Sequence, residues 1–156
     1  MISGIILAAG DSKRMGKTKA LLDYKGKTFI ENIFIALREN KVLDRIIVLG
    51  SNEKEVLSNW TPSGEKTVLN KNPEGGQISS FRVGLKNANP ESEAVLIALV
   101  DQPTIETETY KKIIDFWLKN RDCIIIPKVK RPKNVVYPKT PKPYPPYKRG
   151  HPIIIP

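Results

Sequence analysis

The feature that most constrains the fold is an unbroken apolar run, AVLIALV, at residues 94–100. A strand with one face in solvent alternates apolar and polar side chains, whereas a run without alternation indicates a strand that is covered on both faces. Such strands lie at the centre of sheets that carry helices on both sides. We therefore expect residues 94–100 to form a central strand.

Strand-like and helix-like segments alternate through the first two-thirds of the chain. Thr28 and Glu31 form a capping-box pattern, and the apolar residues that follow lie on one face of a helix. This alternation predicts an α/β fold, a Rossmann-like three-layer sandwich with a mainly parallel sheet. The predicted strands are residues 2–8, 44–49, 66–69, 94–100 and 122–126, and the predicted helices are residues 28–40, 52–60, 79–87 and 107–120.

The 156 residues are expected to form one domain with its own core. No apolar run approaches the ~20 residues that span a bilayer, and the N-terminus lacks the basic start and long apolar stretch of a signal peptide. The single cysteine, Cys123, permits no internal disulfide, which is typical of cytoplasmic proteins. We expect a cytoplasmic protein that does not enter the membrane, with Cys123 buried in the strand at residues 122–126.

The formal net charge of +10 is concentrated in one segment. Eight of the 26 Lys and Arg residues lie in residues 128–149, and no acidic residue follows Asp122. Nine of the 13 prolines lie in residues 127–156, which excludes regular helix but leaves short strands open at residues 135–137 and 153–155. Tyrosines interleave with these lysines, yet the prolines favour a stiff solvated loop at about residues 128–148 over a nucleic-acid site.

The segment LAAGDSKRMGKTKALL, residues 7–22, follows the first strand directly. Its small residues let the backbone turn close to a ligand, and backbone N–H groups in such a turn form an anion-binding concavity. Lys and Arg around the loop neutralise phosphate through charge-assisted hydrogen bonds of ~1.5–3 kcal/mol each. An ordinary turn with a solvated basic rim is the alternative. The candidate nucleotide-binding residues are Leu7, Ala8, Ala9, Gly10, Arg14 and Lys19.

Residues 10–18 also approximate the phosphate loop of P-loop proteins, G-x-x-x-x-G-K-[ST], but with one residue too many. That loop wraps a phosphate with successive amides, so an extra residue disrupts the wrap. A true P-loop also opens a long helix, whereas Gly26 interrupts the pattern here. The sequence therefore argues against a P-loop.

Two further segments place polar residues at the predicted carboxyl ends of strands, where such sheets bind ligands. In NPEGGQISSFRVGL, residues 72–85, the pair Gly75–Gly76 precedes a helix, and Gly76 is a candidate nucleotide-binding residue. Gln77, Ser79 and Ser80 offer donors and acceptors for a base edge or ribose, and the small Ser79 and Ser80, with Gly84 further on, allow close approach. Asp101 follows the most apolar strand, where a carboxylate can hold a Mg²⁺ that bridges triphosphate oxygens. The structural alternatives are a glycine turn with a helix cap and an aspartate that caps the next helix.

The segment RGHP, residues 149–152, contains the only histidine. A histidine without a Cys or His cluster nearby does not indicate a zinc site. Arg149 and His151 are candidates for contact with a second substrate, and a purely structural role stays equally open.

In this order, the four segments resemble the MobA-like nucleotidyltransferase family, and most closely its molybdenum cofactor cytidylyltransferase branch. Residues 7–22 are similar to the family's opening signature, and LVDQP at residues 99–103 is similar to its metal-binding motif. GGQISSFRVGL resembles its base-contacting motif, and RGHP its pterin-side motif. The likeness covers nearly the whole chain except about residues 128–148, and the C-terminus looks shortened by comparison.

The resemblance implies a nucleotide-diphospho-sugar transferase type of fold and transfer of CMP from CTP to a phosphorylated acceptor, with molybdopterin favoured. Ala9 matches the cytidylyl-type members, where guanylyl-type members usually carry glycine. Arg14, Lys19 and Asp101 would be catalytic, Asp101 would hold Mg²⁺, and Arg149 and His151 would face the acceptor. Guanylyl transfer, a sugar-1-phosphate acceptor, and a truncated nucleotide-binding module that works through a partner protein remain as alternatives.

Overall fold

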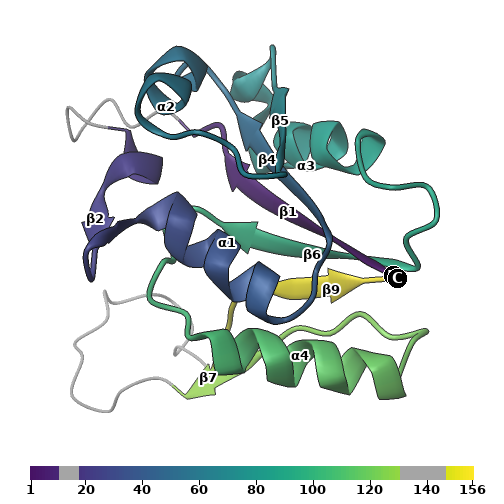
Figure 1. Ribbon diagram of the computed structural model, residues 1–156. Coiled ribbons are helices and arrows are strands. Elements are labelled where there is room, and N and C mark those ends of the chain that lie inside the picture. Colours follow the sequence, from purple (N-terminus) through teal and green to yellow (C-terminus); the bar gives the residue numbers. More distant parts are fainter. Residues whose placement is uncertain (11–17, 131–146) are drawn as a thin grey trace, which may run out of the picture.

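The computed structural model describes residues 1–10, 18–130 and 147–156 (Figure 1). Its centre is a five-stranded sheet in the order β5-β4-β1-β6-β9. The first four strands of that order run parallel, and β9 joins the edge of β6 in the antiparallel direction. The strands are β1 (Ile2–Ala8), β4 (Asp44–Leu49), β5 (Lys66–Leu69), β6 (Ala94–Leu99) and β9 (Ile153–Ile155). The predicted α/β class with a mainly parallel sheet is confirmed.

Helices cover both faces of the sheet, as Figure 1 shows. On one face, Ile6 and Leu96 pack with Phe34 and Trp117 of two helices, and on the other face Ile5 packs with a helix that follows β5. Both strand faces are buried, which explains why residues 94–100 show no alternation. The helices are α1 (Phe29–Glu39), α2 (Glu53–Asn59), α3 (Gly76–Lys86) and α4 (Thr107–Lys119), with α1 and α4 on the first face and α3 on the second.

The N-terminus of α1 has the predicted capping box. The Thr28 backbone N–H donates to Glu31 Oε2 at 2.7 Å, and the Glu31 N–H donates to Thr28 Oγ1 at 3.3 Å. These bonds satisfy backbone groups that would otherwise lack partners in the first turn, so α1 begins where the sequence predicts.

Helix α3 approaches the sheet more closely than a side chain at its contact point would allow. A Cβ on Gly84 would lie 2.5 Å from Ile5 Cγ2 and 3.1 Å from Val48 Cγ2. The helix begins at Gly76, three residues before the predicted start at Ser79, and Gly76 has a positive φ of 72°. Because glycine tolerates this conformation, the chain can turn sharply into α3.

Short elements connect the larger ones. Two 3-10 turns and two small antiparallel ribbons lie outside the main sheet, and among the described residues no helix is long and apolar enough to cross a membrane. These elements are η1 (Lys19–Leu21), β2 (Asp23–Tyr24), β3 (Lys27–Thr28), η2 (Pro73–Gly75), β7 (Lys128–Lys130) and β8 (Tyr147–Arg149). Thus both ends of the predicted loop at residues 128–148 are strands. Residues 131–146, with the short strand considered at residues 135–137, lie outside the described residues.

Two predictions at residues 122–126 are wrong. The segment is not a strand, because only Ile125 pairs with the sheet, through two hydrogen bonds of 2.9 and 3.1 Å to Ile154 of β9. Cys123 is exposed rather than buried. Its N–H instead bonds to the Asn120 carbonyl in the turn after α4, and the place beside β6 is taken by β9. An apolar run thus stays largely on the surface, with Ile124 58% exposed.

Candidate active site

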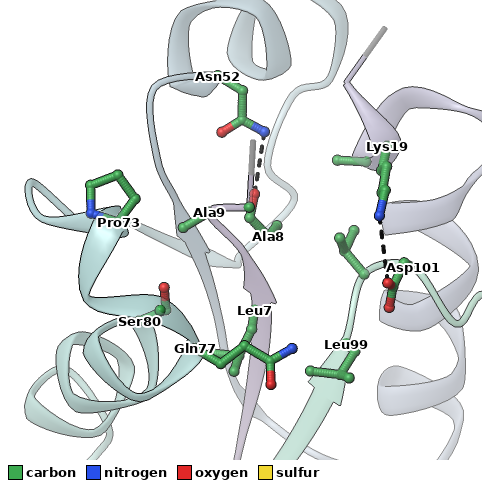
Figure 2. Close-up of a pocket in the computed structure, with 14 residues that line it drawn as sticks. Leu7, Ala8, Ala9, Lys19, Asn52, Pro73, Gln77, Ser80, Leu99 and Asp101 are labelled. Carbon is green, nitrogen blue, oxygen red and sulfur yellow. Dashed lines mark hydrogen bonds and ion pairs between the residues drawn. The ribbon is translucent and has the colours of Figure 1, made fainter. Parts of the chain in front are cut away.

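A cavity of about 280 Å³ lies at the carboxyl ends of β1 and β6 (Figure 2). Parallel strands end at the same edge of the sheet, so segments far apart in sequence meet there. The walls come from β1, η1, the turns after β4 and β6, and the start of α3. The lining residues are Leu7, Ala8, Ala9, Gly10, Lys19, Ala20, Asn52, Pro73, Gly76, Gln77, Ser80, Leu99, Val100 and Asp101.

The backbone after β1 is held by Asn52, a residue that the motifs did not single out. Its side-chain amide donates to the Ala8 carbonyl at 3.2 Å, while its carbonyl oxygen accepts from the Gly50 N–H at 3.1 Å. Ala8 and Ala9 line the cavity and are almost fully buried, with Ala8 in one hydrophobic cluster of the core and Ala9 in the other. Asn52 therefore holds in place the backbone that leads from the end of β1 to Gly10.

The far end of the 7–22 segment is anchored to α2. Thr18 donates to the Glu55 carboxylate twice, from its hydroxyl at 2.5 Å and from its backbone N–H at 3.4 Å. Lys19 follows directly and begins η1, which brings its side chain to the cavity. Arg14, the other predicted phosphate-binding residue, lies outside the described residues.

Lys19 and Asp101 face each other across one side of the cavity, as Figure 2 shows. The distance from Lys19 Nζ to Asp101 Oδ2 is 3.6 Å, and their side chains are 39% and 50% exposed. An ion pair this exposed adds little to folding stability. The arrangement instead holds one cation and one carboxylate where a phosphate and a metal ion would each find a partner of opposite charge.

The α3 side of the cavity carries uncharged polar groups. Ser80 lines the cavity and is 5% exposed, and the Gln77 carboxamide extends from α3 toward the ends of β1 and β6 in Figure 2. Ser79, which the sequence grouped with Ser80, does not line the cavity. Its hydroxyl instead bonds to the backbone carbonyls of Asn72 and Gly76, at 2.9 and 2.8 Å.

Arg149 and His151 lie apart from the cavity lining. Arg149 is exposed on β8, opposite Lys128 of β7. His151 is half-buried. Burial lowers its pKa below the ordinary value, while the negative charge of Asp101 acts in the opposite direction. Burial thus favours the neutral form of the His151 imidazole, and Asp101 favours the charged form.

Asp101 is the carboxylate on the cavity wall. Within residues 1–10, 18–130 and 147–156, no group of three or more His, Cys, Asp or Glu side chains is placed to hold a metal ion. A single carboxylate fits Mg²⁺, which takes one or two protein carboxylates and completes its shell with phosphate oxygens and water. It does not fit a structural zinc site, which needs four protein ligands.

The sheet, the helices on both faces and the cavity at the carboxyl strand ends define a fold of the nucleotide-diphospho-sugar transferase type. A putative glucose-1-phosphate thymidylyltransferase from Bacillus anthracis has the same fold, with a TM-score of 0.74 at 16% identity over 99% of this chain and 70% of its own. In sequence, the family model of the MobA-like NTP transferase domain matches residues 4–155. The chain belongs to that family.

Relatives in sequence carry different names. The chain is 32% identical over 114 residues to nicotine blue oxidoreductase from Paenarthrobacter nicotinovorans, covering 72% of this chain and 55% of the relative. It is 29% identical, with the same coverage, to a probable molybdenum cofactor guanylyltransferase from Bacillus cytotoxicus. It is also 30% identical to 2-C-methyl-D-erythritol 4-phosphate cytidylyltransferase from Dictyoglomus thermophilum, over 76% of this chain and 53% of that protein. The chain thus spans about half the length of these relatives.

Among solved structures, Rv0371c from Mycobacterium tuberculosis matches with a TM-score of 0.71 and 30% identity, over 80% of this chain and 63% of its own. A second structure of Rv0371c is a complex with manganese and matches with a TM-score of 0.67 at 26% identity, over 80% of this chain and 62% of its own.

Proposed function

We propose that this chain is a nucleotidyltransferase that transfers the nucleotidyl group of a nucleoside triphosphate to a phosphorylated small molecule. The observation that carries this proposal is the meeting of Lys19 and Asp101 with the backbone of Ala8–Gly10 around one cavity. Family membership supports the same chemistry. Guanylyl- and cytidylyltransferases among the relatives support it further.

In the proposed reaction, a phosphate oxygen of the acceptor attacks the α-phosphorus of the triphosphate. The bond from the α-phosphorus to its bridging oxygen breaks on the opposite side, and pyrophosphate leaves with that oxygen. A phosphate is already a nucleophile at pH 7, so no side chain has to remove a proton. Lys19 would orient the triphosphate and neutralise charge that builds up on it, which is the main work in phosphoryl-type transfers.

Asp101 would hold a divalent cation, proposed to be Mg²⁺. A metal ion held there would supply positive charge to offset that of the phosphates. The Lys19–Asp101 pair would then separate, with Lys19 turning to a phosphate. The manganese complex of Rv0371c supports a divalent metal in a related fold. We also assign phosphate contacts to Arg14, and acceptor contacts to Arg149 and His151.

CTP is the proposed nucleotide and molybdopterin the proposed acceptor. Ala9 lines the cavity, and it supports CTP because cytidylyl-type members of the family carry alanine at this place where guanylyl-type members usually carry glycine. One methyl group discriminates by only about 10- to 200-fold, so GTP is the alternative substrate. The guanylyltransferase name of the Bacillus cytotoxicus relative supports molybdopterin as the acceptor and GTP as that alternative.

A second candidate function is nucleotide binding without turnover by this chain alone. It is favoured because the chain spans only 53–55% of the length of the relatives above. In that case a partner protein would supply the remaining groups.

A thermal-unfolding titration with CTP, GTP, ATP and UTP, with and without Mg²⁺, tests the proposal. A ligand at 100 times its Kd adds about 2.7 kcal/mol to the stability of the folded state, which is readily measured. We expect a Mg²⁺-dependent rise in Tm, largest with CTP, and pyrophosphate release when acceptor is added. Binding without pyrophosphate release would favour the second candidate. No rise with any triphosphate would contradict both.

A further inference from the structure

Next to Ser80 of the cavity lining lies a buried amide whose orientation is fixed by the backbone. Asn70 follows β5 and is 3% exposed. Its N–H donates to the Leu49 carbonyl at 2.8 Å, and its side-chain oxygen accepts from the Asn72 N–H at 3.0 Å. Because a backbone N–H can only donate, the Asn70 oxygen must face Asn72. The NH₂ group must then face the opposite way, toward α3.

That NH₂ group donates to two neighbouring serines. The distance from Asn70 Nδ2 is 2.8 Å to Ser79 Oγ and 3.0 Å to Ser80 Oγ. The Ser79 hydroxyl in turn donates a hydrogen bond to the backbone carbonyl of Asn72 or of Gly76. Ser80 accepts a hydrogen bond from Asn70, but among the described residues its hydroxyl proton has no acceptor. Ser80 also lines the cavity, where a ligand could provide one. Asn70 occupies one of the two lone pairs of the Ser80 hydroxyl, so the Ser80 proton has to point away from Asn70 and stays available to donate.

The two sides of the cavity differ in chemistry, which suggests what Ser80 meets. Lys19 and Asp101 lie on one side, whereas Ser80, Gln77 and Pro73 lie on the α3 side in Figure 2. Charged groups suit phosphates, and an uncharged, partly apolar wall suits a nucleobase. An acceptor atom of the base that reached Ser80 would therefore find a hydroxyl proton that Asn70 keeps directed away from itself.

We infer that Asn70 is a positioning residue that holds the Ser80 hydroxyl as a hydrogen-bond donor to the nucleobase. This inference rests on the proposed function. A base acceptor that pairs with this buried hydroxyl gains a hydrogen bond, whereas a ligand that offers no polar atom there leaves the hydroxyl proton unpaired. Asn70 thus contributes to base recognition without touching the ligand.

The test compares CTP with ribose 5-triphosphate, which has the same phosphates and no base. Isothermal titration at pH 8 with Mg²⁺ gives the Kd of each ligand. The Kd of ribose 5-triphosphate divided by the Kd of CTP measures the contribution of the base to binding. We expect Ser80→Ala to reduce that ratio about 10-fold, the effect of one buried hydrogen bond.

The informative variant is Asn70→Asp. The introduced carboxylate still accepts from Asn72 but also accepts from Ser80, so the Ser80 proton turns away from the cavity. We expect the base contribution to fall about 10-fold or more in this variant. In the Ser80→Ala background, Asn70→Asp should change it by less than about 2-fold, because the group through which Asn70 acts is gone.

Ser79→Ala is the matched control, since Ser79 also bonds to Asn70 but does not line the cavity. It should lower Tm and leave the base contribution unchanged. If Asn70→Asp does not fold, Asn70→Ala replaces it, with a smaller loss that again vanishes in the Ser80→Ala background.

Equal weakening of CTP and ribose 5-triphosphate by Asn70→Asp would overturn the inference, since Asn70 would then act only on the fold or on phosphate binding. The same holds if wild-type protein binds both ligands equally well, a result that leaves the proposed function standing. Failure of wild-type protein to bind either ligand would overturn the proposed function together with the inference.

Discussion

Lys19 and Asp101 illustrate how a residue can matter for function and little for stability. Both side chains are half-exposed, and their 3.6 Å ion pair is open to solvent. Screening by water leaves such a pair less than about 1 kcal/mol. In the proposed complex the same two charges would face phosphate and metal ion inside the cavity, where less water competes. Substitution of either residue should therefore lower the activity and leave the stability of the fold nearly unchanged.

We predict that Lys19→Ala and Asp101→Asn each lower pyrophosphate release by about 100-fold or more, the usual effect of removing a group that stabilises transition-state charge. Tm should change little. Lys112→Ala is the control, because Lys112 is a 75% exposed cation on α4. Wild-type turnover in both site variants would show that the reacting phosphates lie elsewhere.

Helix α3 is the element that joins the core to the candidate site. Gly84 sits against Ile5 and Val48 of the sheet, while Gly76, Gln77 and Ser80 line the cavity one to two turns earlier. A rigid helix transmits a shift at one end to the other. We therefore expect the width of the cavity to depend on the distance of α3 from the sheet.

Gly84→Ala should therefore weaken both the fold and the site. The added Cβ would lie 2.5 Å from Ile5 Cγ2, so the helix or the strand must move. We expect a loss of about 1–3 kcal/mol in the free energy of unfolding, typical of overpacking, and a higher Kd for CTP. Urea denaturation and isothermal titration measure the two effects.

Gly150→Ala provides the comparison for stability, because a Cβ there meets nothing within 4 Å. It should alter the free energy of unfolding by less than about 0.5 kcal/mol. Comparable losses in the two variants would mean that the close approach of α3 is not the cause.

At the scale of the whole molecule, the two ends of the parallel strands have different roles. The carboxyl ends of the strands form the cavity, and the amino ends are closed by a polar network around Asp44. Its carboxylate accepts from Ser3 at 2.5 Å and from the Asn89 N–H at 2.9 Å, and it pairs with Lys66 at 2.8 Å. The network ties β1, β4 and β5 to the turn before β6.

The network predicts a pH dependence of stability. Burial acts to raise the pKa of Asp44, but the bonds from Lys66, Ser3 and Asn89 outweigh it, so the pKa lies below its ordinary value of 3.8. A lowered pKa in the folded state contributes stability above the unfolded-state pKa, and this contribution is lost as pH falls through the folded-state pKa.

Asp44→Asn should therefore reduce the free energy of unfolding by about 1–3 kcal/mol at pH 7, and the difference from wild type should shrink below pH 3.8. Urea denaturation at pH 7 and at pH 3 measures it. Asp115→Asn, which removes a half-exposed ion pair on α4, should cost less than about 0.5 kcal/mol at either pH. A difference for Asp44→Asn that persisted undiminished far below pH 3.8 would contradict the assignment.

Local patterns predicted most of the main sheet and its helices. The strands at residues 2–8, 44–49 and 66–69 match the observed bounds, and the capping box placed the start of α1, because these signals depend on neighbours within a few residues. Residues 122–126 failed because an apolar run says nothing of which strand takes the place beside β6. In the folded chain β9 pairs with β6, and this pairing depends on contacts between distant parts of the chain.

By itself, the sequence determined the α/β class and singled out three segments whose residues line the cavity, Lys19 and Asp101 among them, because parallel strands end on the same side of a sheet. Only the tertiary structure separated Ser80, which lines the cavity, from Ser79, which bonds to backbone carbonyls. It alone also revealed Asn52 and Asn70. The partners of these two amides include residues of other elements, such as Ala8 and Ser80, and a hydrogen bond depends on where the folded chain brings two groups together.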